Sequence, residues 1–136
     1  MSKLVCEIVT PERLLFSEEV FSVSVPAAKG DLGILVRRAP IMSTLNRGVV
    51  RVRKEEHGEV TSFAVAGGYI ETDGKKVVVL ADRAEAIGKL SLEAVHEARA
   101  DNEKKLASVG EDDSRSAFYR DEIAWYKLLE SQLTRN

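Results

Sequence analysis

Apolar and polar residues alternate with a period of two in three short runs of the first part of the chain, at residues 20–25, 50–53 and 61–65. Successive side chains of a β-strand point to opposite faces, so this period predicts strands with one buried face. In the first run, Phe21 and Val25 share a face. In the second run, two valines alternate with two arginines, and we expect the arginine face to contact water.

A further apolar run and two glycine-containing pairs complete the prediction of a β domain. The apolar run Val77–Leu80 predicts a strand covered on both faces. The preceding pair Asp73-Gly74 predicts a two-residue hairpin with a type I′ turn, which requires positive φ. Gly67-Gly68 is interpreted as a β-bulge, because it lacks the Gly-Lys-Ser/Thr ending of a phosphate loop.

About eight short strands joined by hairpins indicate an antiparallel sandwich or flattened barrel. No segment between these strands is long enough for the helix of a βαβ unit. A parallel nucleotide-binding sheet is therefore not expected.

Spacings of three and four replace the period of two after residue 90 and predict two amphipathic helices. Ser91 is the expected N-cap of the first helix. We expect that helix to end near Gly110, whose left-handed conformation would close it. The polar run 111–114 offers N-caps for the second helix, and the short connection makes the two helices an antiparallel hairpin.

Glycine and proline are distributed unevenly along the chain. All three prolines and eight of the nine glycines lie at or before Gly88. Both residues favour turns over helix interiors, so the architecture is expected to change there. We therefore predict an N-terminal antiparallel β-sandwich at residues 1–87 and a C-terminal antiparallel two-helix hairpin at residues 88–136, joined by a linker at residues 84–89.

Charge and chemistry narrow the function. The 136-residue chain has 20 Lys and Arg against 22 Asp and Glu, a formal net charge of −2. This balance argues against a nucleic-acid partner, which favours a basic excess. His57 and His96 fall in different predicted elements and Cys6 falls within a strand, so no metal site, cofactor site or catalytic cluster is expected. Pattern and composition alone indicate a non-catalytic, two-part binding or assembly protein.

Several segments occur in the order found in one known family. They resemble the epsilon subunit of F-type ATP synthases of the bacterial and chloroplast type, and the similarity runs across roughly residues 4–85. The helical hairpin follows in the place where that family has it. The segments that carry the resemblance are Phe16–Pro26, Gly30–Leu35, Arg38–Pro40, Leu45–Gly48, Ala66–Glu71 and Val79–Asp82.

This resemblance implies a non-catalytic subunit of the rotor central stalk. Such a subunit would bind the gamma subunit and the c-ring, and would help couple ion translocation through the ring to ATP synthesis. Its helices would reach the alpha and beta subunits when they extend, and would then inhibit ATP hydrolysis. The implied location is peripheral, through the complex, on the cytoplasmic face of the bacterial plasma membrane, or on the stromal face of the thylakoid for a plastid-encoded chain. A free-standing β-sandwich that binds a ligand and carries a helical appendage is the alternative.

The resemblance also implies contact residues at two places in the sandwich. In the family, the acidic residue of a glycine-flanked turn lies near the c-ring, and Asp31 takes that place here, although the same residues can form a simple hairpin. Where many relatives have Pro and His in the next loop, this chain has Val36 and Arg38. The implied ring contacts are Gly30, Asp31, Leu32 and Gly33, and the implied gamma contacts are Arg38, Ala39 and Pro40.

Two further expectations concern the helices. Some relatives bind regulatory ATP through an Asp, an Arg and an upstream Glu. Arg99 and Glu85 match that pattern, whereas His96 replaces the Asp and cannot supply a carboxylate, so ATP is not expected as a ligand. Residues 111–136 carry four basic and six acidic residues. Charge would therefore not favour contact with an acidic partner, and an inhibitory contact would use the apolar stripe of Phe118, Trp125 and Leu129.

Overall fold

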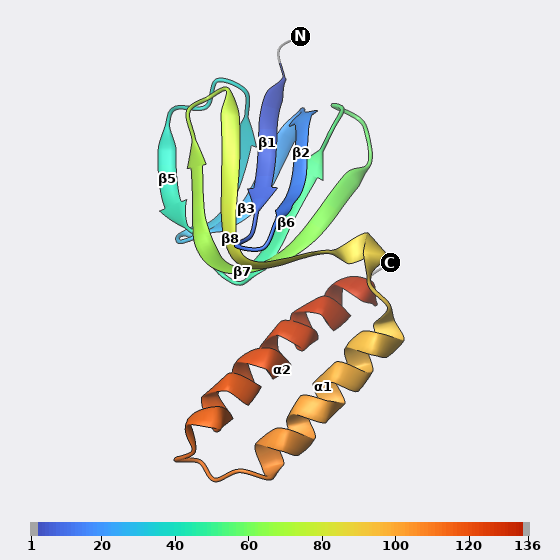
Figure 1. Ribbon diagram of the computed structural model, residues 1–136. Coiled ribbons are helices and arrows are strands. Elements are labelled where there is room, and N and C mark those ends of the chain that lie inside the picture. Colours follow the sequence, from blue (N-terminus) through green and yellow to red (C-terminus); the bar gives the residue numbers. More distant parts are fainter. Residues whose placement is uncertain (1–2, 135–136) are drawn as a thin grey trace. The chain divides into compact units, whose positions relative to one another are not determined.

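The computed structural model describes residues 3–134 and divides the chain into two compact units between Gly88 and Lys89. Within the described residues, the first unit is built from eight strands and the second from two helices (Figure 1). The elements are β1 (Leu4–Val9), β2 (Leu14–Val20), β3 (Ser22–Ala27), β4 (Gly30–Leu35), β5 (Ile41–Thr44), β6 (Gly48–Arg53), β7 (Val60–Thr72), β8 (Lys76–Ala86), the 3-10 helix η1 (Ile87–Lys89), α1 (Leu92–Ala107) and α2 (Ser114–Leu133).

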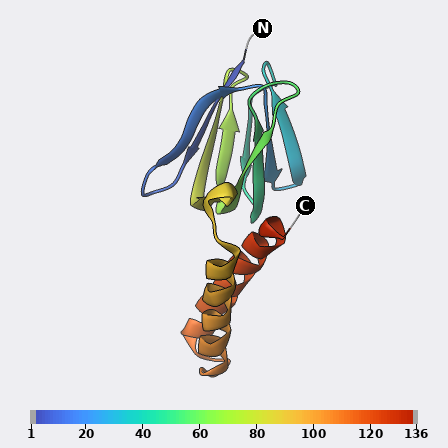
Figure 2. The same cartoon turned by 90° about the vertical axis from the view of Figure 1, so that its right-hand side faces the viewer.

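The strands form one hydrogen-bonded sheet that folds into a sandwich. Its order is β2-β1-β8-β7-β6-β3-β4, and β5 pairs with β7 off this path. The 13-residue β7 pairs first with β6 and then with β5, so it takes part in both layers of the unit (Figure 2). The predicted antiparallel sandwich followed by a helical hairpin is confirmed. One pair, β1 with β8, is parallel.

The core of the first unit follows from the period of two. β1 buries Leu4, Cys6 and Ile8, and the residues between them are partly exposed. β6 buries Val50 and Val52 and leaves its arginines partly exposed, as the sequence predicts. Each aliphatic side chain removed from water in this way contributes roughly 1.5–3 kcal/mol to folding.

Two of the predicted strands differ in the structure. The run 20–25 is divided at Phe21, because β2 ends and β3 begins on either side of it. The run Val77–Leu80 is covered on one face rather than two, since Val79 is fully buried and Leu80 is 45% exposed. A continuous apolar run therefore does not mark a fully covered strand here: its second face lies on the outside of the sandwich.

The pair Gly67-Gly68 is not a β-bulge. Ala66 pairs with Arg83 and Gly68 pairs with Ala81, so the register is the same on both sides and no extra residue is inserted. The two glycines have φ values of +72° and +112°, and a Cβ at Gly68 would lie 1.9 Å from a backbone oxygen of β8. The glycines allow a close backbone approach at the point where β7 exchanges β6 for β5 as its partner.

The turn between β7 and β8 lies where the sequence predicts it but is not of type I′. Gly74 has a φ of +93°, whereas Asp73 is outside the positive region, and type I′ requires both. The Oδ1 atom of Asp73 instead accepts hydrogen bonds of 2.9 Å from the backbone N–H groups of Lys75 and Lys76. These bonds lower the pKa of the Asp73 carboxyl from its ordinary value.

Helix α1 begins as predicted and ends differently. The hydroxyl of Ser91 accepts a 3.3 Å hydrogen bond from the N–H of Ala94, which confirms the N-cap. The helix ends at Ala107, and Ser108 caps it in the right-handed conformation, with its N–H donating to carbonyl oxygens of the last turn. Gly110 is outside the positive-φ region, so the predicted left-handed end is wrong.

Helix α2 is capped from within the predicted run 111–114. Asp113 accepts a 2.9 Å hydrogen bond from the backbone N–H of Arg115, and its carboxylate also binds that residue's guanidinium at 2.7 Å. The hydrogen bonds and charge of Arg115 lower the pKa of Asp113 to about 2. The cap and the ion pair together secure the first turn of α2.

The segment between the two units is shorter than the predicted linker at 84–89. β8 continues to Ala86, and Ile87–Lys89 form a 3-10 turn. Ala84 is buried in the sandwich core. The first three residues of the predicted linker are therefore part of the sandwich, because they still pair with β7.

Candidate functional site

The expected ring contact lies on a strand rather than in a loop. Gly30 opens β4, and the turn that joins β3 to β4 consists of Ala28 and Lys29. Gly30 has a φ of +121°, which only glycine adopts readily. Asp31 pairs with Pro26 and is exposed. The residues form a hairpin, as the simpler interpretation predicts. Residues 30–33 belong to β4 and are not a loop, and Asp31 is accessible to a partner.

A groove of about 510 Å³ lies beside this hairpin, and it is lined by residues 27–32 and 41–44. The N–H of Ala28 donates to the hydroxyl of Ser43 at 3.2 Å, and the side-chain amide of Asn46 donates to the carbonyl oxygen of Ala27 at 2.9 Å. The first bond joins the turn to β5, and the second joins the end of β3 to Asn46, which follows β5. The sandwich therefore presents Lys29 and Asp31 from a β3–β4 hairpin whose turn is held at two points.

The expected gamma contacts lie beyond the other end of β4. Arg38, Ala39 and Pro40 are all exposed. The backbone of this loop is fixed at Arg37, which has a φ of +70° and donates its N–H to the carbonyl oxygen of Gly74 at 2.7 Å. The loop thus lies against the β7–β8 turn and leads directly into β5.

A row of apolar side chains on the outer face of the sheet was missed from the sequence. Leu14 pairs with Val9, Val9 with Leu80, and Leu80 with Tyr69, so these four residues form one line across β2, β1, β8 and β7. Leu14 and Tyr69 are each 56% exposed. Val9 is partly exposed and the other three are exposed, and contiguous exposed apolar side chains are typical of interaction surfaces. We call this line the apolar row.

A signal for this row was present in the sequence. The apolar run Val77–Leu80 contains Leu80, but the run alone predicts a strand covered on both faces and so does not identify Leu80 as exposed. The pairing of β1 with β8 joins residues about 70 positions apart in register, which no local pattern reports.

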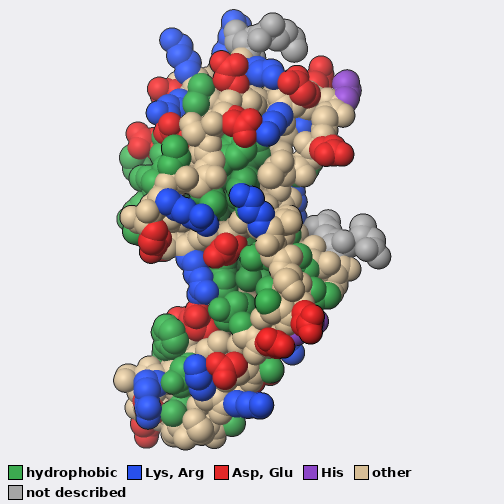
Figure 3. Space-filling view, turned by 45° about the vertical axis from the view of Figure 1, so that its right-hand side comes forward, with side chains coloured by type: hydrophobic (Ala, Val, Ile, Leu, Met, Phe, Trp, Pro, Cys, Tyr) green, Lys and Arg blue, Asp and Glu red, His purple; other side chains and the backbone are tan. Residues whose placement is uncertain are grey.

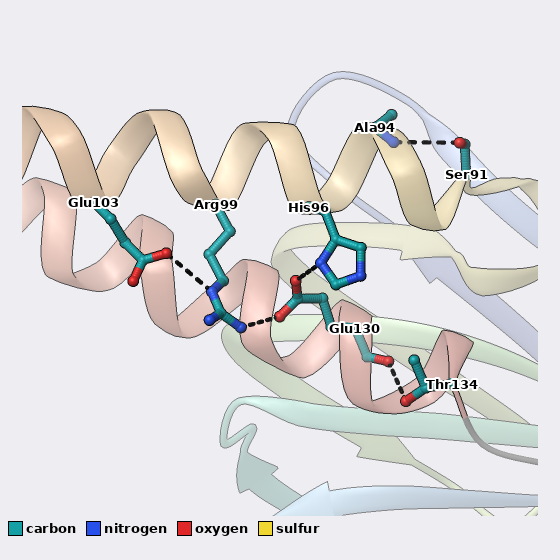
Figure 4. A network of polar contacts seen from close by, with 7 residues as sticks. All are labelled: Ser91, Ala94, His96, Arg99, Glu103, Glu130 and Thr134. Carbon is teal, nitrogen blue, oxygen red and sulfur yellow. Dashed lines mark hydrogen bonds and ion pairs between the residues drawn. The ribbon is translucent and has the colours of Figure 1, made fainter.

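Glu85 and Arg99, which match the nucleotide-binding pattern of some relatives, lie on different elements. Glu85 is on β8 in the first unit, and Arg99 is on α1 in the second. The guanidinium of Arg99 donates to Glu130 of α2 and, at 3.2 Å, to Glu103 (Figure 4). The hydrogen bond to Glu130, and next the one to Glu103, raise the pKa of Arg99 from its ordinary value. The guanidinium of Arg99, which a nucleotide phosphate would need, is thus already hydrogen-bonded to two carboxylates.

The three residues of the expected inhibitory stripe all lie on α2 and differ in exposure. Trp125 and Leu129 are each 2% exposed, whereas Phe118 is 59% exposed and its ring meets that of Tyr119 edge-on at 5.7 Å. In the folded hairpin, Phe118 is the member of the set that a partner can reach.

Groups that could perform catalysis do not converge in the described part of the chain. No cluster of three or more His, Cys, Asp or Glu side chains suited to a metal ion occurs among residues 3–134. Burial, and then the charge of Glu7, raise the pKa of the Cys6 thiol to about 12. Such a thiol stays protonated and is a poor nucleophile.

One face of the molecule carries charges of both signs. On the face drawn in Figure 3, Lys and Arg side chains lie among Asp and Glu side chains. Neither described helix has the length and apolar content needed to cross a membrane. A face with charges of both signs favours specific contacts over long-range attraction of a partner by charges of one sign.

Comparison with known proteins gives a consistent result. Residues 3–87 match the family described as ATP synthase, Delta/Epsilon chain, beta-sandwich domain. The chain is 39% identical over 123 residues to the ATP synthase epsilon chain of Desulforamulus reducens, an alignment that covers 90% of this chain and 89% of the relative. It is 43% identical over 101 residues to the ATP synthase epsilon chain of Dichelobacter nodosus, with 74% and 70% covered.

A solved structure shares the fold at low sequence identity. A chain of the Euglena gracilis mitochondrial ATP synthase, solved with OSCP, F1 and the c-ring, superposes with a TM-score of 0.78 at 15% identity. The superposition covers 98% of this chain and 82% of that one. The order of sandwich and hairpin is therefore preserved where the sequences have diverged.

Proposed function

The chain belongs to the family of ATP synthase epsilon chains, and from this premise we propose how its two units act in the rotor. It is a non-catalytic subunit of the central stalk of F-type ATP synthase, and it is associated with the membrane through that complex. We assign it to the cytoplasmic face of a bacterial membrane. The sandwich is the part that anchors to the rotor, and the hairpin is the regulatory part.

The gamma subunit is the proposed partner of the apolar row. The row, formed by Leu14, Val9, Leu80 and Tyr69, is the observation that carries the proposal, because a large exposed apolar line needs a partner surface. β5 pairs with β7 beside Tyr69, and the loop Arg38–Pro40 leads into β5. One partner could therefore contact the row and the loop together.

The c-ring is the proposed partner of the β3–β4 turn. Lys29 of this turn and Asp31 at the start of β4 are exposed and carry opposite charges, and the adjoining groove supplies apolar surface. Polar loops of a ring subunit would meet both charges. Charges at the rim of such an interface set its orientation more than its affinity.

For the hairpin we propose inhibition of ATP hydrolysis through contact with the alpha and beta subunits, without a bound cofactor. Two observations support the absence of a nucleotide requirement. Arg99 is engaged by Glu130 and Glu103, and His96 faces Glu130 rather than open solvent alone. Phe118 is the exposed apolar residue that offers a first contact.

Association with gamma tests the proposal. The full chain is mixed with purified gamma subunit and passed over a sizing column, and we expect the two to elute together. Failure to associate would contradict a stalk role and would favour a free-standing module. Removal of residues 90–136 tests the inhibitory part separately: ATP hydrolysis by the reconstituted head is expected to rise, and an unchanged rate would contradict inhibition.

A further inference from the structure

We propose that the carboxylate of Glu130 is a latch that holds α1 and α2 together. Glu130 lies on α2 and is 7% exposed. Its Oε1 atom accepts a hydrogen bond from the guanidinium of Arg99, and its Oε2 atom lies against Nδ1 of His96. Figure 4 shows both α1 side chains pointing toward this one carboxylate. The inference rests on the proposed function, because it assigns a controlling step to the regulatory hairpin.

The three polar residues of α1 that take part lie on one face of the helix. His96 and Arg99 are three residues apart, and Glu103 follows four residues later, which places all three on adjacent turns. Arg99 donates to Glu103 at 3.2 Å as well as to Glu130. Glu103 thus holds the Arg99 side chain in position for the carboxylate of the opposite helix.

The second oxygen of Glu130 makes the latch depend on His96. Apart from His96, Oε2 has no hydrogen-bond partner among residues 3–134, although it is buried. Nδ1 of His96 can donate to it either in the Nδ1–H tautomer of the neutral ring or in the imidazolium. Loss of this donor would leave a buried carboxylate oxygen unpaired, which is more costly than loss of an exposed bond.

Few apolar side chains of α1 are buried, so the polar contacts of Glu130 contribute a larger share of the stability of the closed hairpin. Within α1, which the structure describes in full, Val95 is the one buried side chain among 16 residues. α2 buries Ile123, Trp125 and Leu129. A helix with a single buried side chain gains little from tertiary packing, and packing is the usual source of helix stability in proteins. Glu130 therefore controls whether the hairpin is closed.

Distance measurement in the full chain tests the latch. Spin labels are placed at Glu93→Cys and Ser131→Cys, two exposed positions at the latch end of the hairpin. Cys6 is buried and its thiol is protonated, so it stays unlabelled. Pulsed electron paramagnetic resonance is expected to give one short distance. E130Q keeps the side-chain shape and removes the charge, and we expect it to raise the open population about tenfold.

The variants of His96 separate the hydrogen bond from general destabilisation. H96A should open the hairpin, whereas H96N should keep it closed, because the Asn amide N–H can take the place of Nδ1–H. D101N is the matched control: it removes a carboxylate of α1 that pairs with Lys105 at 3.0 Å within the same helix, and it should leave the distances unchanged. Unchanged distances in both E130Q and H96A would overturn the latch.

Failure of the latch and failure of the proposed function give different results. An E130Q chain that opens but does not change ATP hydrolysis by the complex would support the latch and contradict the inhibitory role. If circular dichroism shows that E130Q loses helix content, the distances in H96A and H96N test the latch instead, since neither variant removes the buried carboxylate. Equal distances in those two variants would overturn the dependence on His96.

Discussion

The backbone N–H of Arg37 donates a 2.7 Å hydrogen bond to the carbonyl oxygen of Gly74, and this bond joins the loop before β5 to the turn between β7 and β8. Both residues have positive φ, +70° and +93°. The proposed gamma-contact loop, Arg38–Pro40, begins at this junction. Its conformation is therefore set by a glycine that lies 36 positions after Arg38 in the sequence.

We predict that Gly74→Ala destabilises the sandwich. A Cβ at this position would lie 2.9 Å from the carbonyl oxygen of Arg38, and the left-handed conformation adds its own cost. The expected loss is about 1–2 kcal/mol in the free energy of unfolding, measured by urea denaturation. Gly88→Ala is the control, because a Cβ there meets nothing within 4 Å and its φ is not positive. Equal effects of the two changes would contradict this explanation.

Changes in the apolar row should weaken binding to gamma without unfolding the chain. Leu80→Ser and Tyr69→Ser alter side chains that are 45% and 56% exposed. We expect each to raise the dissociation constant for gamma about tenfold, measured by calorimetry, because truncation of a central apolar contact typically costs more than 1 kcal/mol. Val60→Ser, at another exposed apolar position outside the row, should bind normally. Normal binding by the row variants would remove the row from the interface.

Helix α2 should lose its N-cap contribution in acid. The folded-state pKa of Asp113 is lowered to about 2 by Arg115, from an ordinary value of 3.8. The ionised carboxylate is favoured in the folded state, so its contribution is complete above pH 3.8 and is lost as the pH falls through about 2. Asp113→Ala should lower the thermal midpoint by a few degrees at pH 7. The difference from the unchanged chain should disappear near pH 2, and a constant difference would contradict the assignment.

Cys6 should make the sandwich less stable in alkali. Burial and the charge of Glu7 raise the pKa of its thiol from 9.0 to about 12 in the folded state. The unfolded chain loses this proton first, so stability should fall as the pH rises from about 9 toward 12. Cys6→Ala should remove that part of the pH dependence, measured by urea denaturation. Iodoacetamide should modify Cys6 only after unfolding, and rapid modification of the folded chain would contradict its burial.

The predictable parts of the fold were those controlled by neighbours in the sequence. Ser91 and Asp113 cap the helices because their side chains reach backbone N–H groups two or three residues ahead. The alternation in β6 identified its buried valines for the same local reason. The wrong type of turn at Asp73-Gly74 and the missing left-handed end at Gly110 show the limit of this argument. The element was correctly placed in both cases, and the backbone conformation within it was not.

The sequence by itself thus determined two units, their classes and most of their boundaries, because strand and helix periods are properties of adjacent residues. Only the tertiary structure decided which faces are exposed and which distant groups meet. The apolar row exists because strand pairing aligns Leu80 with Val9 and Tyr69. The latch exists because the packing of α1 against α2 brings Glu130 to His96 and Arg99. Register and helix packing depend on long-range contacts, which a period along the chain does not encode.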